Sequence, residues 1–232
     1  MFCMLAFAML FAASATIPDG QVLESAETSL FSEGPYAKIE EFTEGVTFSE
    51  ESRGTLNLTA SAGTVDYKQC DARWGSNIMV SRTICKVGCF ITSFADALYD
   101  HGVTLEVGGK QMIASPGSFN SWLKANGGYA AGDNFISSSV DKICRKSATK
   151  GCRVNFVPSL SVKGMTMAKM QELIHQRVTV IGHVRNGGHF VRIVGWNAQN
   201  PSLLIVTDPA FKTQYKFTDV MGWNVYNVFG TN

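Results

Sequence analysis

The sequence predicts an α+β fold, with helices early in the chain and an antiparallel sheet after them. Apolar residues recur at helical spacing up to Arg177, whereas alternating, β-branched segments dominate from Val178 onward. Short turn-forming segments separate these later strands, and short connections favour neighbouring antiparallel strands. Residues 61–232 are long enough for one substantial hydrophobic core, so we expect a single domain over this range.

The chain opens with a short apolar segment, residues 1–15, which ends in Ala13-Ser14-Ala15. This pattern is typical of a cleaved secretory signal peptide, and the segment is too short to span a bilayer. Asn57-Leu58-Thr59 is a glycosylation sequon, which is compatible with export. We therefore expect a secreted or lumenal protein, a lysosome- or vacuole-like compartment included, with no membrane span.

Charge divides the remainder of the chain. Residues 16–60 carry nine acidic and two basic residues, whereas residues 61–232 carry 18 basic and 10 acidic residues. One interpretation of residues 16–60 is an acidic pro-segment that docks on a basic domain, and the other is a linker or a decoration of the fold. The basic residues of the larger part are scattered among acids and aromatics, which argues against a nucleic-acid partner.

The first helix of the domain is predicted to begin at Cys89 and to end before Gly102. Its apolar positions follow helical spacing: Phe90, Phe94, Ala97 and Leu98. The unpaired N–H groups and the positive dipole of a helix start favour an anion, so this position favours the nucleophilic thiolate. The plainer interpretation is that Cys89 is a buried thiol or half of a disulfide.

Two further helices are predicted, over residues 117–128, which a glycine pair closes, and over residues 166–177, which have one apolar side. The strands are predicted over residues 178–184, 189–196, 203–207, 214–217 and 225–229.

Six cysteines are present, and Cys3 would leave with the signal peptide. An odd number then remains in an oxidising compartment, which indicates a reactive thiol or an intermolecular bridge. Cys144 and Cys152 are close in sequence and form one natural pair. Pairing of Cys70 with Cys85 is the other expectation and leaves Cys89 as the thiol. Pairing of Cys70 with Cys89 stays open and would exclude catalysis by Cys89.

A cysteine nucleophile needs a base, and four histidines are available. We expect His101 to be structural, at the end of the Cys89 helix where an imidazole suits the dipole, and His175 to be exposed. His189 begins a strand beside a glycine-lined gap, which makes it the favoured base. His183, one strand earlier, is its rival.

Two further residues complete the candidate set. Asp208 ends an apolar strand and would orient the His189 imidazole if the two strand ends meet, although an Asp before Pro is also a common turn residue. Gln69 would donate its side-chain amide to an oxyanion, together with the backbone N–H of Cys89.

Four stretches carry a resemblance to a known family: residues 67–75, 87–93, 187–196 and 206–210. In this order and spacing they resemble the bacteriocin-processing (double-glycine) cysteine peptidases, within the papain-like group. The resemblance covers roughly residues 65–210. It implies Cys89 as nucleophile, His189 as base, Asp208 as orienting residue and Gln69 as oxyanion donor. It also implies a papain-like fold whose cysteine helix packs on an antiparallel sheet.

The sequence departs from this family in two places. Phe90-Ile91 stands where the family usually has Gly-Pro, and these bulky residues are expected to narrow the cleft. No transporter segments follow the domain in this sequence, which argues against a double-glycine leader substrate.

The sequence therefore predicts a secreted papain-like cysteine hydrolase, a peptidase or amidase, that acts as a monomer on a peptide or amide substrate without a cofactor. The alternatives are an inactive binding protein on the same fold and an acyl transferase. A metal site built from Cys89, His189 and Asp208 is disfavoured because the tight ligand spacing of such sites is missing.

Overall fold

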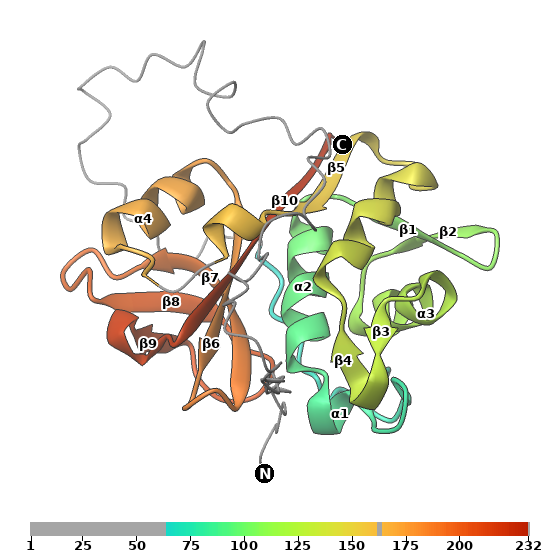
Figure 1. Cartoon of the computed structure of the whole chain (residues 1–232), viewed down its shortest axis with the longest axis horizontal. Coiled ribbons are helices and arrows are strands. Elements are labelled where there is room, and N and C mark those ends of the chain that lie inside the picture. Colours follow the sequence, from blue (N-terminus) through green and yellow to red (C-terminus); the bar gives the residue numbers. More distant parts are fainter. Residues whose placement is uncertain (1–63, 162–163, 232) are drawn as a thin grey trace, which may run out of the picture. The chain divides into compact units, whose positions relative to one another are not determined.

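The computed structural model describes residues 64–161 and 164–231 (Figure 1). The predicted signal peptide, residues 1–15, and the predicted acidic leader, residues 16–60, lie outside the described residues. The described part of the chain mixes helices with antiparallel sheet, so the α+β prediction is confirmed. None of its helices has the length and apolarity needed to cross a membrane.

The three predicted helices lie close to their predicted ranges, whereas the helix over Ile84–Val87 was not predicted, because that segment was expected to be a loop. The α-helices are α1 (Ile84–Val87), α2 (Cys89–Asp100), α3 (Pro116–Asn126) and α4 (Met167–His175). The 3₁₀ segments are Ala131–Asp133, Ser137–Arg145, Pro158–Leu160 and Phe217–Asp219. Ser115 caps α3 in a capping box with Ser118, and Gly127 ends it in the left-handed conformation, as its position after the last helical residue predicts.

The main sheet has six strands in the order β5-β10-β6-β7-β8-β9, all antiparallel. Its strands are β5 (Lys150–Phe156), β6 (Thr179–Val184), β7 (His189–Trp196), β8 (Leu203–Thr207), β9 (Gln214–Lys216) and β10 (Gly222–Thr231). Two small hairpins complete the strands: β1 (Thr104–Val107) with β2 (Lys110–Ile113), and β3 (Tyr129–Ala130) with β4 (Asn134–Phe135).

The prediction that the last strand, β10, lies beside β9 is wrong. A short connection, residues 217–221, follows β9, yet β10 pairs with β6 and β5 instead of β9. Four strand spacings in a flat sheet would measure about 19 Å, which is close to the full reach of so short a connection. Part of that connection is a compact 3₁₀ turn, and Phe217 contacts Trp223 at 5.2 Å between ring centroids. The sheet must therefore curl to bring the end of β9 to the start of β10.

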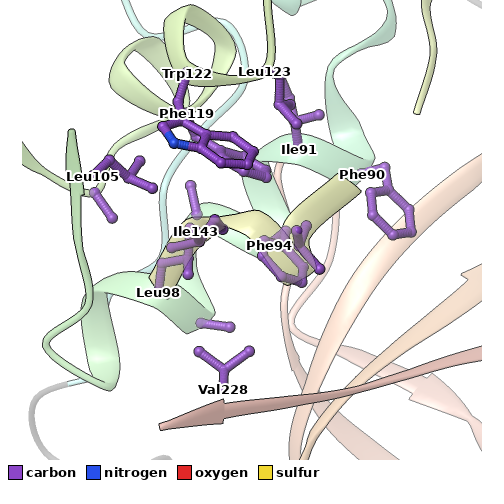
Figure 2. Close-up of a cluster of buried hydrophobic side chains, with 14 of the residues drawn as sticks. Phe90, Ile91, Phe94, Leu98, Leu105, Phe119, Trp122, Leu123, Ile143 and Val228 are labelled. Atoms are coloured by element: carbon purple, nitrogen blue, oxygen red, sulfur yellow. The ribbon is translucent and has the colours of Figure 1, made fainter. Parts of the chain in front are cut away.

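Helix α2 lies between the two halves of the described fold (Figure 1). It packs against β7, β6 and β10 on one side and against α3 on the other. Its buried residues, Cys89 to Leu98, join a core that reaches from α3 to the sheet. Figure 2 shows this core around Phe94, with Phe119 and Trp122 from α3 and Val228 from β10. The cysteine helix is thus held on two sides by apolar packing.

Candidate active site

Cys89 begins α2, as predicted, and its side chain is 1% exposed. A tight junction separates it from α1: the Gly88 N–H donates to the Ile84 carbonyl at 2.7 Å. A Cβ atom on Gly88 would stand 2.6 Å from that carbonyl oxygen and from Cγ2 of Ile84. Only glycine allows the chain to turn this closely, so Gly88 fixes where Cys89 enters the helix.

Both predicted disulfides are present, Cys70–Cys85 and Cys144–Cys152. Cys89 stands outside them and keeps its thiol. The alternative pairing of Cys70 with Cys89 is therefore excluded.

His189 and Asp208 form a buried pair at one edge of the sheet. Nε2 of His189, at the start of β7, lies 2.7 Å from Oδ1 of Asp208, which follows β8. The side chains are 3% and 0% exposed. Because the carboxylate accepts, Nε2 carries the shared proton and Nδ1 is the ring nitrogen left to act as a base. The predicted meeting of the two strand ends is confirmed.

Further donors surround the Asp208 carboxylate. The backbone N–H groups of Ala210, Phe211 and Lys212 donate to it at 2.8–3.0 Å, and the Tyr215 hydroxyl donates at 2.9 Å. Burial alone would raise the pKa of Asp208, but the hydrogen bonds from His189, Lys212 and Ala210 outweigh it and hold this pKa well below its usual value. Asp208 is therefore a fixed anion that also shapes its own loop.

Gln69 reaches the same place from the start of the domain. Its backbone N–H donates to the Pro209 carbonyl at 3.0 Å, and its Nε2 donates to the Cys85 carbonyl at 2.6 Å. The amide has a second N–H on Nε2. Its Oε1 is buried and has no hydrogen-bond partner among the described residues. Gln69 thus joins the Asp208 loop to the segment that precedes Cys89.

The residues that follow the two candidate catalytic groups touch each other. Phe90 meets Phe190 edge-to-face at 5.0 Å between ring centroids. The Ser93 hydroxyl donates to the Phe190 carbonyl at 3.4 Å. These contacts set the first turn of α2 against the start of β7, which brings Cys89 and His189 to the same end of the helix–sheet interface.

The other histidines have structural surroundings. His183 stacks on Phe190 at 4.2 Å, and its Nε2 pairs with the Gly187 carbonyl oxygen at 2.6 Å, within the turn that joins β6 to β7. His175 is exposed, as predicted. His101 is buried at the end of α2, where burial lowers its pKa to about 4, helped by Arg192 and Arg177. It is neutral at ordinary pH, so the expected favourable charge against the helix dipole is absent.

Phe90 and Ile91 do not face a cleft, so that expectation is wrong. Both belong to the hydrophobic core, where they are 9% and 1% exposed. Phe90 packs on Phe135 at 4.6 Å, and Ile91 lies beside Leu123 of α3 (Figure 2). Their bulk fills the space between α2 and its neighbours.

Three residues near this site were not anticipated. Tyr215 lies on β9 opposite Leu204 of β8. The sequence predicts the two strands but not their register, so it could not place Tyr215 near Asp208. Phe211, 53% exposed, stands edge-on to the His189 ring at 5.0 Å between ring centroids. Asp96 is completely buried on α2, and it is the one charged residue within the buried run from Cys89 to Leu98, which was the signal for it.

Among residues 64–161 and 164–231, no three His, Cys, Asp or Glu side chains gather closely enough to hold a metal ion. Comparison of the chain with protein-family models, with curated proteins and with solved structures finds no match.

Proposed function

We propose that this protein is a papain-like cysteine hydrolase that cleaves a peptide or another amide bond. The observation that carries the proposal is the buried His189–Asp208 pair, 2.7 Å apart, at the sheet edge where the thiol-bearing helix begins. A thiol, an imidazole and an anion that orients it are the groups that nucleophilic acyl transfer needs.

The chemistry follows from the roles of these groups. Nδ1 of His189 accepts the Cys89 thiol proton, and the thiolate attacks the carbonyl carbon. The second N–H on Nε2 of Gln69 stabilises the resulting oxyanion, and the positive end of the α2 dipole adds to this. His189 then protonates the departing amine. Water, deprotonated by His189, finally releases the acyl group from the thioester.

The test uses the full-length protein with a peptide digest of casein, and mass spectrometry reports new peptide termini. Cys89→Ala and His189→Ala are expected to lower turnover by about 10³-fold or more, because the residues act as a unit. His183→Ala is the matched control, since His183 lies in the same hairpin but bonds to Gly187, and it should retain turnover.

Alkylation of the native protein gives a second measurement. Iodoacetamide should modify Cys89 as the one thiol of the described residues, and His189→Ala should slow this reaction near neutral pH. Labelling of Cys89 without any hydrolysis would leave a binding protein on this fold. New products that appear only with an added amine would indicate an acyl transferase.

A further inference from the structure

Two carboxyl groups of α2 hold the segment that leads to Gln69. Oδ1 of Asp96 accepts the Tyr67 N–H at 3.0 Å, and Oδ1 of Asp100 accepts the Val65 N–H at 3.0 Å. Four residues of helix rise about 6 Å, and two residues of extended chain span about 6.6 Å, so the two spacings match. The segment therefore runs antiparallel to α2, toward Cys89, and Gln69 comes next along this path.

Asp96 differs from Asp100 in its surroundings. Asp100 is half-buried and ion-paired with Arg192. Asp96 is 0% exposed and lies two turns after Cys89, which puts both residues on the same helix face. It is therefore the buried member of the pair and the one nearer to the candidate nucleophile.

Asp96 also meets the end of β8, which Asp208 follows. The Thr207 side chain lies close enough to lower the pKa of the Asp96 carboxyl. The contact falls short of a full hydrogen bond, because Oδ2 of Asp96 and the Thr207 hydroxyl are both buried without a partner among the described residues. A small rotation would pair these two groups with each other. Asp96 thus stands between the segment of Gln69 and the strand end of Asp208.

We propose that Asp96 is a positioning residue, which sets the Gln69 segment and the Thr207–Asp208 strand end against the helix of Cys89. The inference rests on the proposed function, because it assigns Asp96 a role in aligning that site. Asp96 touches none of the reacting groups and acts through Tyr67 and Thr207.

The protonation state of Asp96 gives this role a signature. Burial raises the pKa of Asp96 to about 8, and the Tyr67 N–H, the Arg192 charge and the Thr207 side chain offset this only in part, while Asp66 raises it further. The titratable and charged groups around Asp96 are Arg192 from β7, Asp66 and the Tyr67 hydroxyl from the entering segment, and Asp100 one turn later on α2. The end of β8 contributes only the uncharged Thr207. At neutral pH the carboxyl is protonated, so Oδ2 can donate to Thr207.

Because the pKa of Asp96 is raised in the folded protein, its contribution to stability depends on pH. The folded protein keeps a proton that the unfolded chain loses near pH 3.9, so the contribution of Asp96 to stability decreases as pH rises from about 4 to about 8. Above that range a buried charge stands between the two tethered segments. Asparagine has the shape and hydrogen-bonding groups of the protonated acid and does not titrate.

The experiment compares Asp96→Asn, Asp96→Ala and Thr207→Val with wild type between pH 5 and pH 9.5. Thr179→Val is the matched control for Thr207→Val. Thr179 is also a buried strand threonine whose hydroxyl has no partner among the described residues, but it lies on β6. We expect Asp96→Asn to keep kcat within about twofold of wild type at neutral pH and to retain it above pH 8, where wild type loses activity. Asp96→Ala should lose about tenfold or more, since small misplacements of reacting groups are costly.

Hydrogen exchange separates this inference from the proposed function. In Asp96→Ala the Tyr67 amide and the 207–212 loop should exchange faster, whether or not the protein turns over a substrate. If the wild-type protein shows no turnover, the proposed function is refuted, and the hydrogen-exchange comparison still tests the positioning role. Unchanged exchange, or a wild-type pH profile of kcat in a folded Asp96→Ala variant, would overturn the positioning role. If Asp96→Ala does not fold, equal pH profiles of wild type and Asp96→Asn would overturn it.

Discussion

Asp208 accepts five hydrogen bonds, more than orienting one imidazole requires. Two of its donors, the Lys212 N–H and the Tyr215 hydroxyl, use Oδ2 alone. An amide nitrogen at that position would face two donors. Asp208 therefore holds the His189 imidazole and also anchors its own loop.

The first prediction is that Asp208→Asn lowers kcat by about 10²–10⁴-fold, because the amide no longer fixes the imidazole tautomer. It should also cost about 1–3 kcal/mol of stability, since the Lys212 N–H loses its acceptor. The measurement is turnover together with urea unfolding. Asp219→Asn, an exposed carboxylate that accepts only from the Lys216 N–H among the described residues, is the control and should change neither.

The second prediction concerns acid. Because the folded pKa of Asp208 lies below its unfolded value, the carboxylate contributes stability above about pH 4 that is lost as pH falls below it. Thermal unfolding of wild type should show this acid loss, and Asp208→Asn should show less of it. Parallel melting curves for the two proteins from pH 2 to pH 6 would contradict the assignment of the anion.

At this scale the sequence predicted Cys89, His189, Asp208 and Gln69, and the fold gathers all four around one end of α2. It did not predict Tyr215 or Asp96. Tyr215 bonds directly to Asp208, from a position that depends on the β8–β9 register. Asp96 is linked to the site through Tyr67, which lies far from it in the sequence. Periodicity reports which face is buried, but not which polar groups meet there.

Among the elements, the junction of α1 and α2 is the most constrained. The third prediction is that Gly88→Ala lowers stability by about 1–3 kcal/mol through overpacking against Ile84, and slows alkylation of Cys89 because the helix start must shift. Gly222→Ala is the control, since its Cβ would meet the nearest atom, Cβ of His183, at an ordinary 3.7 Å. Equal alkylation rates in both variants would show that Gly88 does not control the placement of Cys89.

The bounds of β7 and β8 were predicted correctly, because turn residues flank both strands, β8 is mostly apolar, and β7 is mostly apolar apart from His189 and Arg192. The β1–β2 hairpin was missed although Gly108-Gly109, both at positive φ, is a strong two-residue turn signal. β5 was missed because Lys150-Gly151-Cys152 interrupts its apolar pattern. The place of β10 depends on sheet curl, which no local pattern encodes.

At the scale of the whole molecule, the two disulfides can be compared with each other. Both close short loops, but only the Cys70–Cys85 bridge lies next to Gln69. The fourth prediction is that replacing Cys144 and Cys152 by serine costs about 2.5 kcal/mol, and replacing Cys70 and Cys85 costs about 3 kcal/mol, from the loops they close. Only the second change should lower kcat, because Gln69 bonds to the Cys85 carbonyl. Unfolding and turnover of both double variants check this, and an equal loss of kcat would contradict it.

If the proposed function holds, reduction of the Cys70–Cys85 bridge would loosen the segment that carries Gln69. Cys70 is exposed and Cys85 half-buried, so reductants can reach the bond. A strong reductant in excess would therefore cut the link beside Gln69. Dithiothreitol, a routine additive in assays of thiol enzymes, would depress the activity that it is added to protect.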